Sequence, residues 1–302
     1  MKVFLAGAND KKCCEIIYHA NHPNFLSTYY EHQKSVSKEW LYWYKKTKKK
    51  GASWIMDSGL FTMMFGAGRD KTYNEKDLLE YTYKYLRDMK KIRYDDYIVE
   101  MDVHKVLGLE SLKRFRAIFE KEYPLEKTIY VWHKEEGESG FRELCKKYPY
   151  IAISIPELRI ILNSRKILRN AVVYLLKIAN EINPNIKIHL LGCSDTNLLS
   201  QKGYYSCDSS DWLSTSRWRN GGTMWGGKKF KRVRIRTSLW KGYFEENKEK
   251  IMSEEMANKL YTTEKMKESY LNLGVNIISF NLMNQYINNR HFNYESVLKI
   301  KE

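Results

Sequence analysis

Short apolar runs alternate with amphipathic, helix-like stretches along most of this chain. Each run has the length of a buried strand, about five to seven residues. Strands that alternate with helices form parallel βαβ units, because a parallel connection needs a long crossover that is usually helical. The seven runs are KVFLAGA (2–8), ASWIMDSG (52–59), DYIVEMDV (96–103), KTIYVWH (127–133), YIAISIP (150–156), IKIHLLG (186–192) and GYYSCDS (203–209).

This alternation favours a closed (β/α)8 TIM-type barrel over an open, doubly wound sheet. The 302 residues are enough for such a barrel, which typically needs about 250. Two segments compete to be the eighth strand: VRIRTS, from Val233, and VNIISF, from Val275. We expect one barrel domain over 1–302, with a basic insertion after strand 7 at 217–240 and a helical C-terminal part at 241–302.

The stretches between the runs have apolar residues at helical spacing. They include 74–92, 109–123 and 165–182. Asn74 is the expected N-cap of the first, although Asp77 stands where a capping box would have Glu or Gln.

The chain is basic, with 52 Lys and Arg against 36 Asp and Glu and a net charge of +16. This excess favours a polyanionic partner, although a solvated basic surface is the alternative. The five cysteines include one adjacent pair, Cys13 and Cys14, which indicates reduced thiols in a cytoplasmic compartment. We expect no signal peptide and no membrane span, because the apolar runs are too short.

Three of the apolar runs end in an aspartate: Asp57, Asp102 and Asp208. In a barrel, the carboxyl ends of the strands converge on one mouth, where active sites lie. One such aspartate is more often a helix cap or turn residue. Three of them predict a cluster whose pKa values are pushed apart, as separate acid, base and nucleophile roles require.

A basic segment follows Asp208, and tryptophans are interleaved in it. Cations bind phosphates and aromatic rings stack on unpaired bases, so the segment predicts nucleic-acid binding, with a solvated hairpin as the alternative. The expected phosphate-binding residues are Arg217, Arg219, Lys228, Lys229, Lys231, Arg232, Arg234 and Arg236.

Four motifs in this order resemble the tRNA-guanine transglycosylase superfamily, and most closely its phage-type 7-deazaguanine DNA transglycosylases. The resemblance extends over about residues 1–227 and implies a barrel enzyme that exchanges guanine in DNA for a 7-deazaguanine base. The motifs are MDSGLF (56–61), EMD (100–102), LLGCSD (190–195) and GYYSCDSSDWLSTSRWRNG (203–221).

The resemblance also implies a role for each matching residue. Asp208 would be the nucleophile and Asp57 the general acid and base. The implied base-binding residues are Asp102, Phe61, Ser58, His133, Ser154, Ile155, Leu191 and Gly192. The base would leave the helix stack before it reacts.

Two departures from the family bear on the substrate. His133 stands where the tRNA enzymes have Gln, and no cysteine follows Cys207, so their C-terminal zinc motif is missing. Asp211 is a rival nucleophile. We expect DNA as the partner and no metal or other cofactor. The alternatives are the same exchange on tRNA, a carbohydrate-active barrel hydrolase, and a barrel that binds nucleic acid without catalysis.

Overall fold

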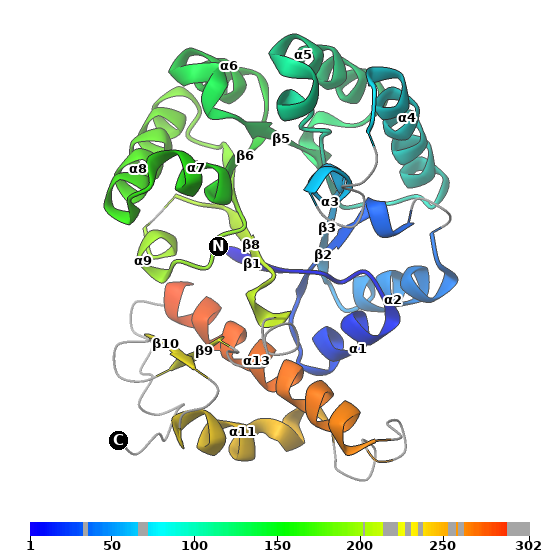
Figure 1. The fold of residues 1–302 in the computed structure, drawn as a ribbon, viewed down its shortest axis with the longest axis vertical. Coiled ribbons are helices and arrows are strands. Elements are labelled where there is room, and N and C mark those ends of the chain that lie inside the picture. The colour runs from blue at the N-terminus through cyan, green and yellow to red at the C-terminus, as the bar shows by residue number, and fades with distance from the viewer. Residues whose placement is uncertain are drawn as a thin grey trace.

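Eight parallel strands close into a barrel with helices around it (Figure 1). This computed structural model describes residues 1–32, 36–65, 72–201, 203–213, 223–226, 231–234, 238–252, 258 and 263–288. The strands are β1 (Lys2–Ala6), β2 (Asn24–Thr28), β3 (Ser53–Asp57), β4 (Tyr97–Val99), β5 (Thr128–Trp132), β6 (Tyr150–Ser154), β7 (Lys187–Leu191) and β8 (Ser206–Ser209). Strand β1 pairs with β8, which closes the ring and confirms the predicted barrel.

Both segments proposed for the eighth strand were wrong. The missing strand is β2, which lies between β1 and β3 and pairs Leu26 with Ile55. Its sequence, NFLST, has only two large apolar residues, so it does not stand out as a buried run. Val233 lies in β10 (Lys231–Arg234), outside the barrel, and Val275 lies in a helix. The strand that carries Asp208 is therefore the eighth, and the basic insertion follows strand 8 rather than strand 7.

Helices follow the strands around the barrel. The predicted cap of α4 is confirmed: Asn74 accepts a hydrogen bond from the Asp77 amide at 3.0 Å, and the Asp77 carboxylate accepts one back at 3.0 Å. Asp therefore completes the capping box in place of Glu. The helices around the barrel are α1 (Lys11–His19), α2 (Lys38–Lys48), α3 (Leu60–Phe65), α4 (Glu75–Lys91), α5 (His104–Glu122), α6 (Gly137–Lys147), α7 (Ile155–Leu162), α8 (Arg165–Ile182) and α9 (Thr196–Leu199).

The last described helix, α13 (Glu264–Asn288), completes the ring of helices. It packs against α1, α9 and α11 (Ser238–Ile251), beside the first and last strands (Figure 1). The Asn276 side chain donates to the Trp212 carbonyl at 2.9 Å, and that of Asn281 donates to the Ala20 carbonyl at 2.9 Å. The apolar residues near Val275, taken above as a possible strand, form the buried part of this helix. The basic insertion is thus placed between β8 and its helix.

A buried arginine fastens the β4 and β5 side of the barrel. Arg116 donates to both oxygens of Glu100 at 3.1 Å, to Glu136 at 2.6 Å and to the Val131 carbonyl at 2.7 Å. Burial raises the pKa of Glu100 to about 7, although Arg116 opposes this shift. Glu100 therefore anchors the strand, and Asp102, two residues further on, is left at the mouth. Among the described residues, no helix is both long and apolar enough to cross a bilayer.

Candidate active site

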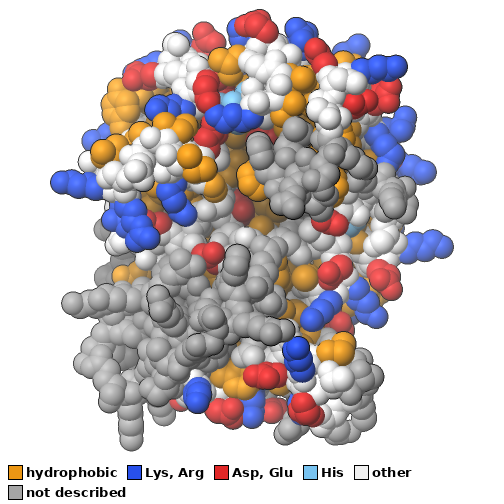
Figure 2. Space-filling model, viewed as in Figure 1, with side chains coloured by type: hydrophobic (Ala, Val, Ile, Leu, Met, Phe, Trp, Pro, Cys, Tyr) orange, Lys and Arg blue, Asp and Glu red, His pale blue; other side chains and the backbone are white. Residues whose placement is uncertain are grey.

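The three predicted aspartates meet at the barrel mouth. Asp57 ends β3, Asp102 lies just beyond β4, and Asp208 lies in β8. The charges of Asp102 and Asp208 both act on Asp57, so the three carboxylates are close enough to interact. In the view of Figure 2, the surface of the molecule is hollowed near its centre, and acidic side-chain atoms are visible in the hollow.

Asp57 is partly buried and has an unusual pKa. Burial, then the charges of Asp102 and Asp208, raise its pKa from 3.8 to about 7, while a hydrogen bond from the Gly59 amide (2.7 Å) opposes the shift. A carboxyl group with a pKa near 7 exists in both protonation states at neutral pH. It can therefore give and take a proton within one catalytic cycle.

The turn after Asp57 requires glycine. Gly59 has φ of +82°, and a Cβ at this position would lie 2.6 Å from Cβ of Tyr30. The turn is tied down because the Tyr81 hydroxyl donates to the Ser58 carbonyl at 2.7 Å. Ser58 itself is buried.

Asp208 is buried, and two donors hold it in place. The Gly192 amide donates to its Oδ1 at 2.9 Å, and Nε2 of His189 lies 3.1 Å from the same oxygen. Among the described residues both bonds go to Oδ1, so Oδ2 is the oxygen available for covalent chemistry. Gly192, implied above as a base contact, lies against Asp208.

His189 belongs to a chain of hydrogen bonds inside the barrel. Its Nδ1 lies 2.7 Å from the Ser206 hydroxyl, which lies 2.6 Å from the Tyr150 hydroxyl. Since Nε2 faces a carboxylate, it carries the ring proton, and Nδ1 accepts from Ser206. Each group then donates to the next from Tyr150 to Asp208.

The rival nucleophile, Asp211, is placed differently. It lies beyond β8, its amide donates to the Ser209 hydroxyl at 3.1 Å, and its carboxylate accepts a hydrogen bond from Ser194. The charge of Asp208 is among those that raise the pKa of Asp57. This geometry favours Asp208 as the reacting carboxylate.

The other predicted base-binding residues lie at, or just beyond, the carboxyl ends of barrel strands. Phe61 lies in the first turn of α3, and its side chain is 73% exposed. Leu191, at the end of β7, is partly buried. The Ser154 hydroxyl accepts from the Glu157 amide at 3.4 Å and caps α7. Ile155 is fully buried, so only its backbone can reach a ligand.

His133 follows β5 and is buried beside Glu157, with Nδ1 3.3 Å from the carboxylate. Burial would raise the pKa of Glu157, but hydrogen bonds from His104, His133 and Lys105 lower it well below its usual range. Nε2 of His133 is buried and has no hydrogen-bond partner among the described residues.

The predicted phosphate-binding residues are only partly placed. Lys231, Arg232 and Arg234 lie on β10, which pairs antiparallel with β9 (Thr223–Gly226) in a separate two-stranded sheet. Outside the described residues lie Arg217, Arg219, Lys228, Lys229 and Arg236.

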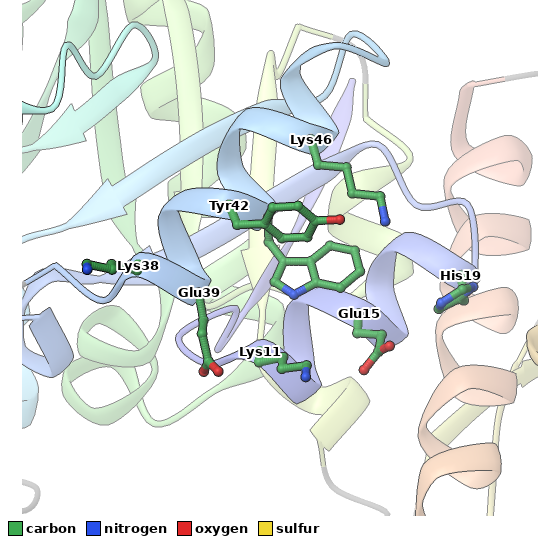
Figure 3. Close-up of a pocket in the computed structure, with 8 residues that line it drawn as sticks. Lys11, Glu15, His19, Lys38, Glu39, Tyr42 and Lys46 are labelled. Carbon is green, nitrogen blue, oxygen red and sulfur yellow. The ribbon is translucent and has the colours of Figure 1, made fainter. Parts of the chain in front are cut away.

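A pocket of about 480 Å³ lies between α1 and α2, on the outer surface of the barrel (Figure 3). Lys46 lies over the Trp43 ring, 4.5 Å from its centre. The mouth aspartates do not line this pocket, and its lysines are balanced in part by Glu15 and Glu39. It is therefore a poor candidate for the reaction.

Three residues beside the nucleophile candidate are absent from the sequence-based prediction: Tyr150, His189 and Ser206. A signal was available on β7, where Lys187 and His189 alternate with apolar residues and so point into the barrel. Polar residues at interior positions of a buried strand need partners, and here those partners lead to Asp208.

No protein-family model matches this chain, and no curated protein matches it either. The transglycosylase resemblance therefore stays a prediction that rests on its four motifs.

The raised pKa of Asp57 predicts a pH-dependent gain in stability for Asp57→Asn. Between about pH 4 and 7 the folded protein holds a proton that the unfolded chain has released, so wild-type stability falls as the pH rises. Asn has no such proton. The variant should gain up to about 3 kcal/mol in unfolding free energy relative to wild type between pH 5 and pH 8.

Urea unfolding of both proteins at the two pH values measures this gain. Glu110→Gln, a substitution at an exposed carboxylate, is the control and should show little change. An equal difference between Asp57→Asn and wild type at both pH values would show that Asp57 has an ordinary pKa.

Proposed function

We propose that this protein is a base-exchange transglycosylase that replaces guanine in DNA with a 7-deazaguanine derivative. The observation that carries the proposal is the group of three carboxylates at one mouth, with the pKa of Asp57 near 7 and Asp208 oriented by two donors. Asp57 and Asp208 would then divide the two roles that base exchange at a glycosidic bond requires: Asp57 transfers the proton and Asp208 is the nucleophile.

In the first half of the proposed reaction, Oδ2 of Asp208 attacks C1′ of the flipped nucleotide. The bond from C1′ to the guanine nitrogen breaks, and protonated Asp57 gives its proton to the leaving base. The sugar is then held as an aspartyl ester. The hydrogen bonds from His189 and Gly192 to Oδ1 support this step, because they fix the carboxylate while its other oxygen reacts.

In the second half, ionised Asp57 takes a proton from the incoming base. The nitrogen of that base attacks C1′, and the ester bond to Asp208 breaks. Both carboxylates return to their starting states and no redox change occurs. The two displacements retain the configuration at C1′.

We assign recognition of the base to Asp102 and Phe61, which lie near the proposed acid, Asp57. The Asp102 carboxylate accepts hydrogen bonds, as the donor edge of a guanine-type ring requires. Exposed Phe61 offers a face for stacking. These roles come from the family resemblance, and the position of both residues at the mouth is consistent with them.

A cationic surface beside the mouth supports a nucleic-acid substrate. We call residues 159–167, from the end of α7 to the start of α8, the α7–α8 surface. Arg159, Arg165 and Lys166 are exposed there, next to Ile160, which is 81% exposed. Residues 158–180 contain five Lys or Arg and no Asp or Glu. Basic and apolar side chains gather over this region in Figure 2, which suits phosphates and unstacked bases.

Radiolabelled guanine tests the reaction. Wild-type enzyme should incorporate label into duplex DNA, and Asp208→Asn should reduce exchange by at least about a thousandfold while it still binds DNA. Label counted in acid-precipitated polymer measures exchange, and filter binding measures affinity.

Asp211→Asn is the matched control and should keep exchange within about threefold of wild type, because the Asp211 carboxylate lies beyond β8 and accepts a hydrogen bond from Ser194. Loss in Asp211→Asn and retention in Asp208→Asn would move the nucleophile. Label in tRNA instead of DNA would favour the tRNA reaction. Label in neither, with release of sugar from oligosaccharides, would favour a hydrolase.

The α7–α8 surface predicts a change in salt dependence. In Arg165→Ser/Lys166→Ser, the slope of log K against log salt for duplex DNA should flatten by about 0.9 for each phosphate that the protein no longer neutralises. The control Lys91→Ser/Lys121→Ser removes the same amount of charge from the C-terminal ends of α4 and α5 and should keep the wild-type slope. Equal slopes in all three proteins would show that DNA binds elsewhere.

A further inference from the structure

Three potential metal ligands meet at the mouth, outside the group of three aspartates. His104 begins α5, His133 follows β5, and Glu157 lies in the first turn of α7. Their donor atoms all lie within 4.8 Å of one another. The adjacent ends of β4, β5 and β6 therefore build this cluster, although its members are far apart in the sequence.

The distances within the cluster suit a small divalent cation. Nε2 of His104 lies 3.4 Å from Oε1 of Glu157, and Nδ1 of His133 lies 3.3 Å from Oε2. Each ring thus approaches its own oxygen of Glu157 at about 3.3–3.4 Å, which is the spacing between two ligands of a tetrahedral ion with bonds of about 2.0–2.1 Å. The side chains of His104 and Glu157 are 5% and 14% exposed, so the site is enclosed but not sealed.

Hydrogen bonds within the protein do not complete this cluster. His104 faces two acceptors, the Asp102 carbonyl at 3.3 Å and Glu157 at 3.4 Å, so both of its ring nitrogens are directed at oxygen atoms. The His133 ring stacks on it, with centres 3.4 Å apart, and its buried Nε2 has no partner among the described residues. Two imidazole nitrogens therefore face one carboxylate, as they would around a shared cation, and one buried ring nitrogen is left without a partner among the described residues.

We propose that His104, His133 and Glu157 bind a divalent transition-metal ion of the zinc class. Two imidazole nitrogens and one carboxylate are a ligand set that such ions accept, with a fourth position left for water or a substrate atom. This revises the sequence-based expectation of a metal-free protein. The site is also separate from the cysteine-containing zinc motif of the tRNA enzymes, and it does not depend on the proposed function.

The ammonium group of Lys105 would compete with a bound metal ion for the Glu157 carboxylate. Its ammonium lies 3.1 Å from Oε1 of Glu157 and also pairs with Glu135, and its side chain is 43% exposed. A bound ion would take Glu157 and leave Lys105 paired with Glu135. Gly108, with φ of +81°, breaks α5 after its first turn and so sets that turn apart from the rest of the helix.

Cobalt titration tests the site without an activity assay. Protein stripped with chelator should bind one equivalent of Co²⁺, with the visible absorption of a four-coordinate ion, and Zn²⁺ should displace it. His104→Ala and His133→Ala should each weaken binding by at least about tenfold. Lys105→Ala should tighten it by about two- to fivefold, because a competing ion pair is removed.

His19→Ala, on α1 and away from the mouth, is the control and should bind Co²⁺ like wild type. Thermal unfolding of each apo variant shows whether it is folded. No Co²⁺ binding by folded wild type, or equal binding by wild type, His104→Ala and His133→Ala, would overturn the proposal. Because no exchange is measured, failure here is distinct from failure of the proposed function.

Discussion

Closure of the parallel sheet puts the ends of β3, β4 and β8 on one rim, where Asp57, Asp102 and Asp208 repel one another. The proposed chemistry depends on that repulsion. Burial and two like charges make the ionised form of Asp57 costly, so its proton is available near neutral pH. Asp208 is held by two groups at its Oδ1, Nε2 of His189 and the Gly192 amide, and these contacts fix the carboxylate beside Asp57.

The rest of the fold keeps these charges in place. Arg116 neutralises Glu100 on the outer side of β4, so the strand can carry Asp102 to the mouth without a second unpaired buried charge nearby. Inside the barrel, Tyr150 and Ser206 complete the bonds of His189. Helix α13 supplies the last helix of the ring, and the eight barrel strands close without β9 or β10 of the basic insertion.

The sequence predicted the barrel and its three mouth aspartates, because buried parallel strands are apolar on both faces and stand out as runs. It could not predict β2, whose Asn24, Ser27 and Thr28 make it resemble a loop. It also could not predict the cluster of His104, His133 and Glu157, because strand order, not spacing along the chain, brings the three together. His189 was within reach, as a polar residue at an interior strand position.

The proposed nucleophile is tested most directly by locating the covalent bond between enzyme and sugar. Wild-type enzyme incubated with a guanine-containing DNA oligonucleotide, without incoming base, is quenched in acid, digested with nuclease and protease, and analysed by tandem mass spectrometry. We expect a deoxyribose-linked fragment attached to Asp208 on the peptide that spans β8. Attachment to Asp57 or Asp211, or exchange without any enzyme-linked sugar, would contradict it.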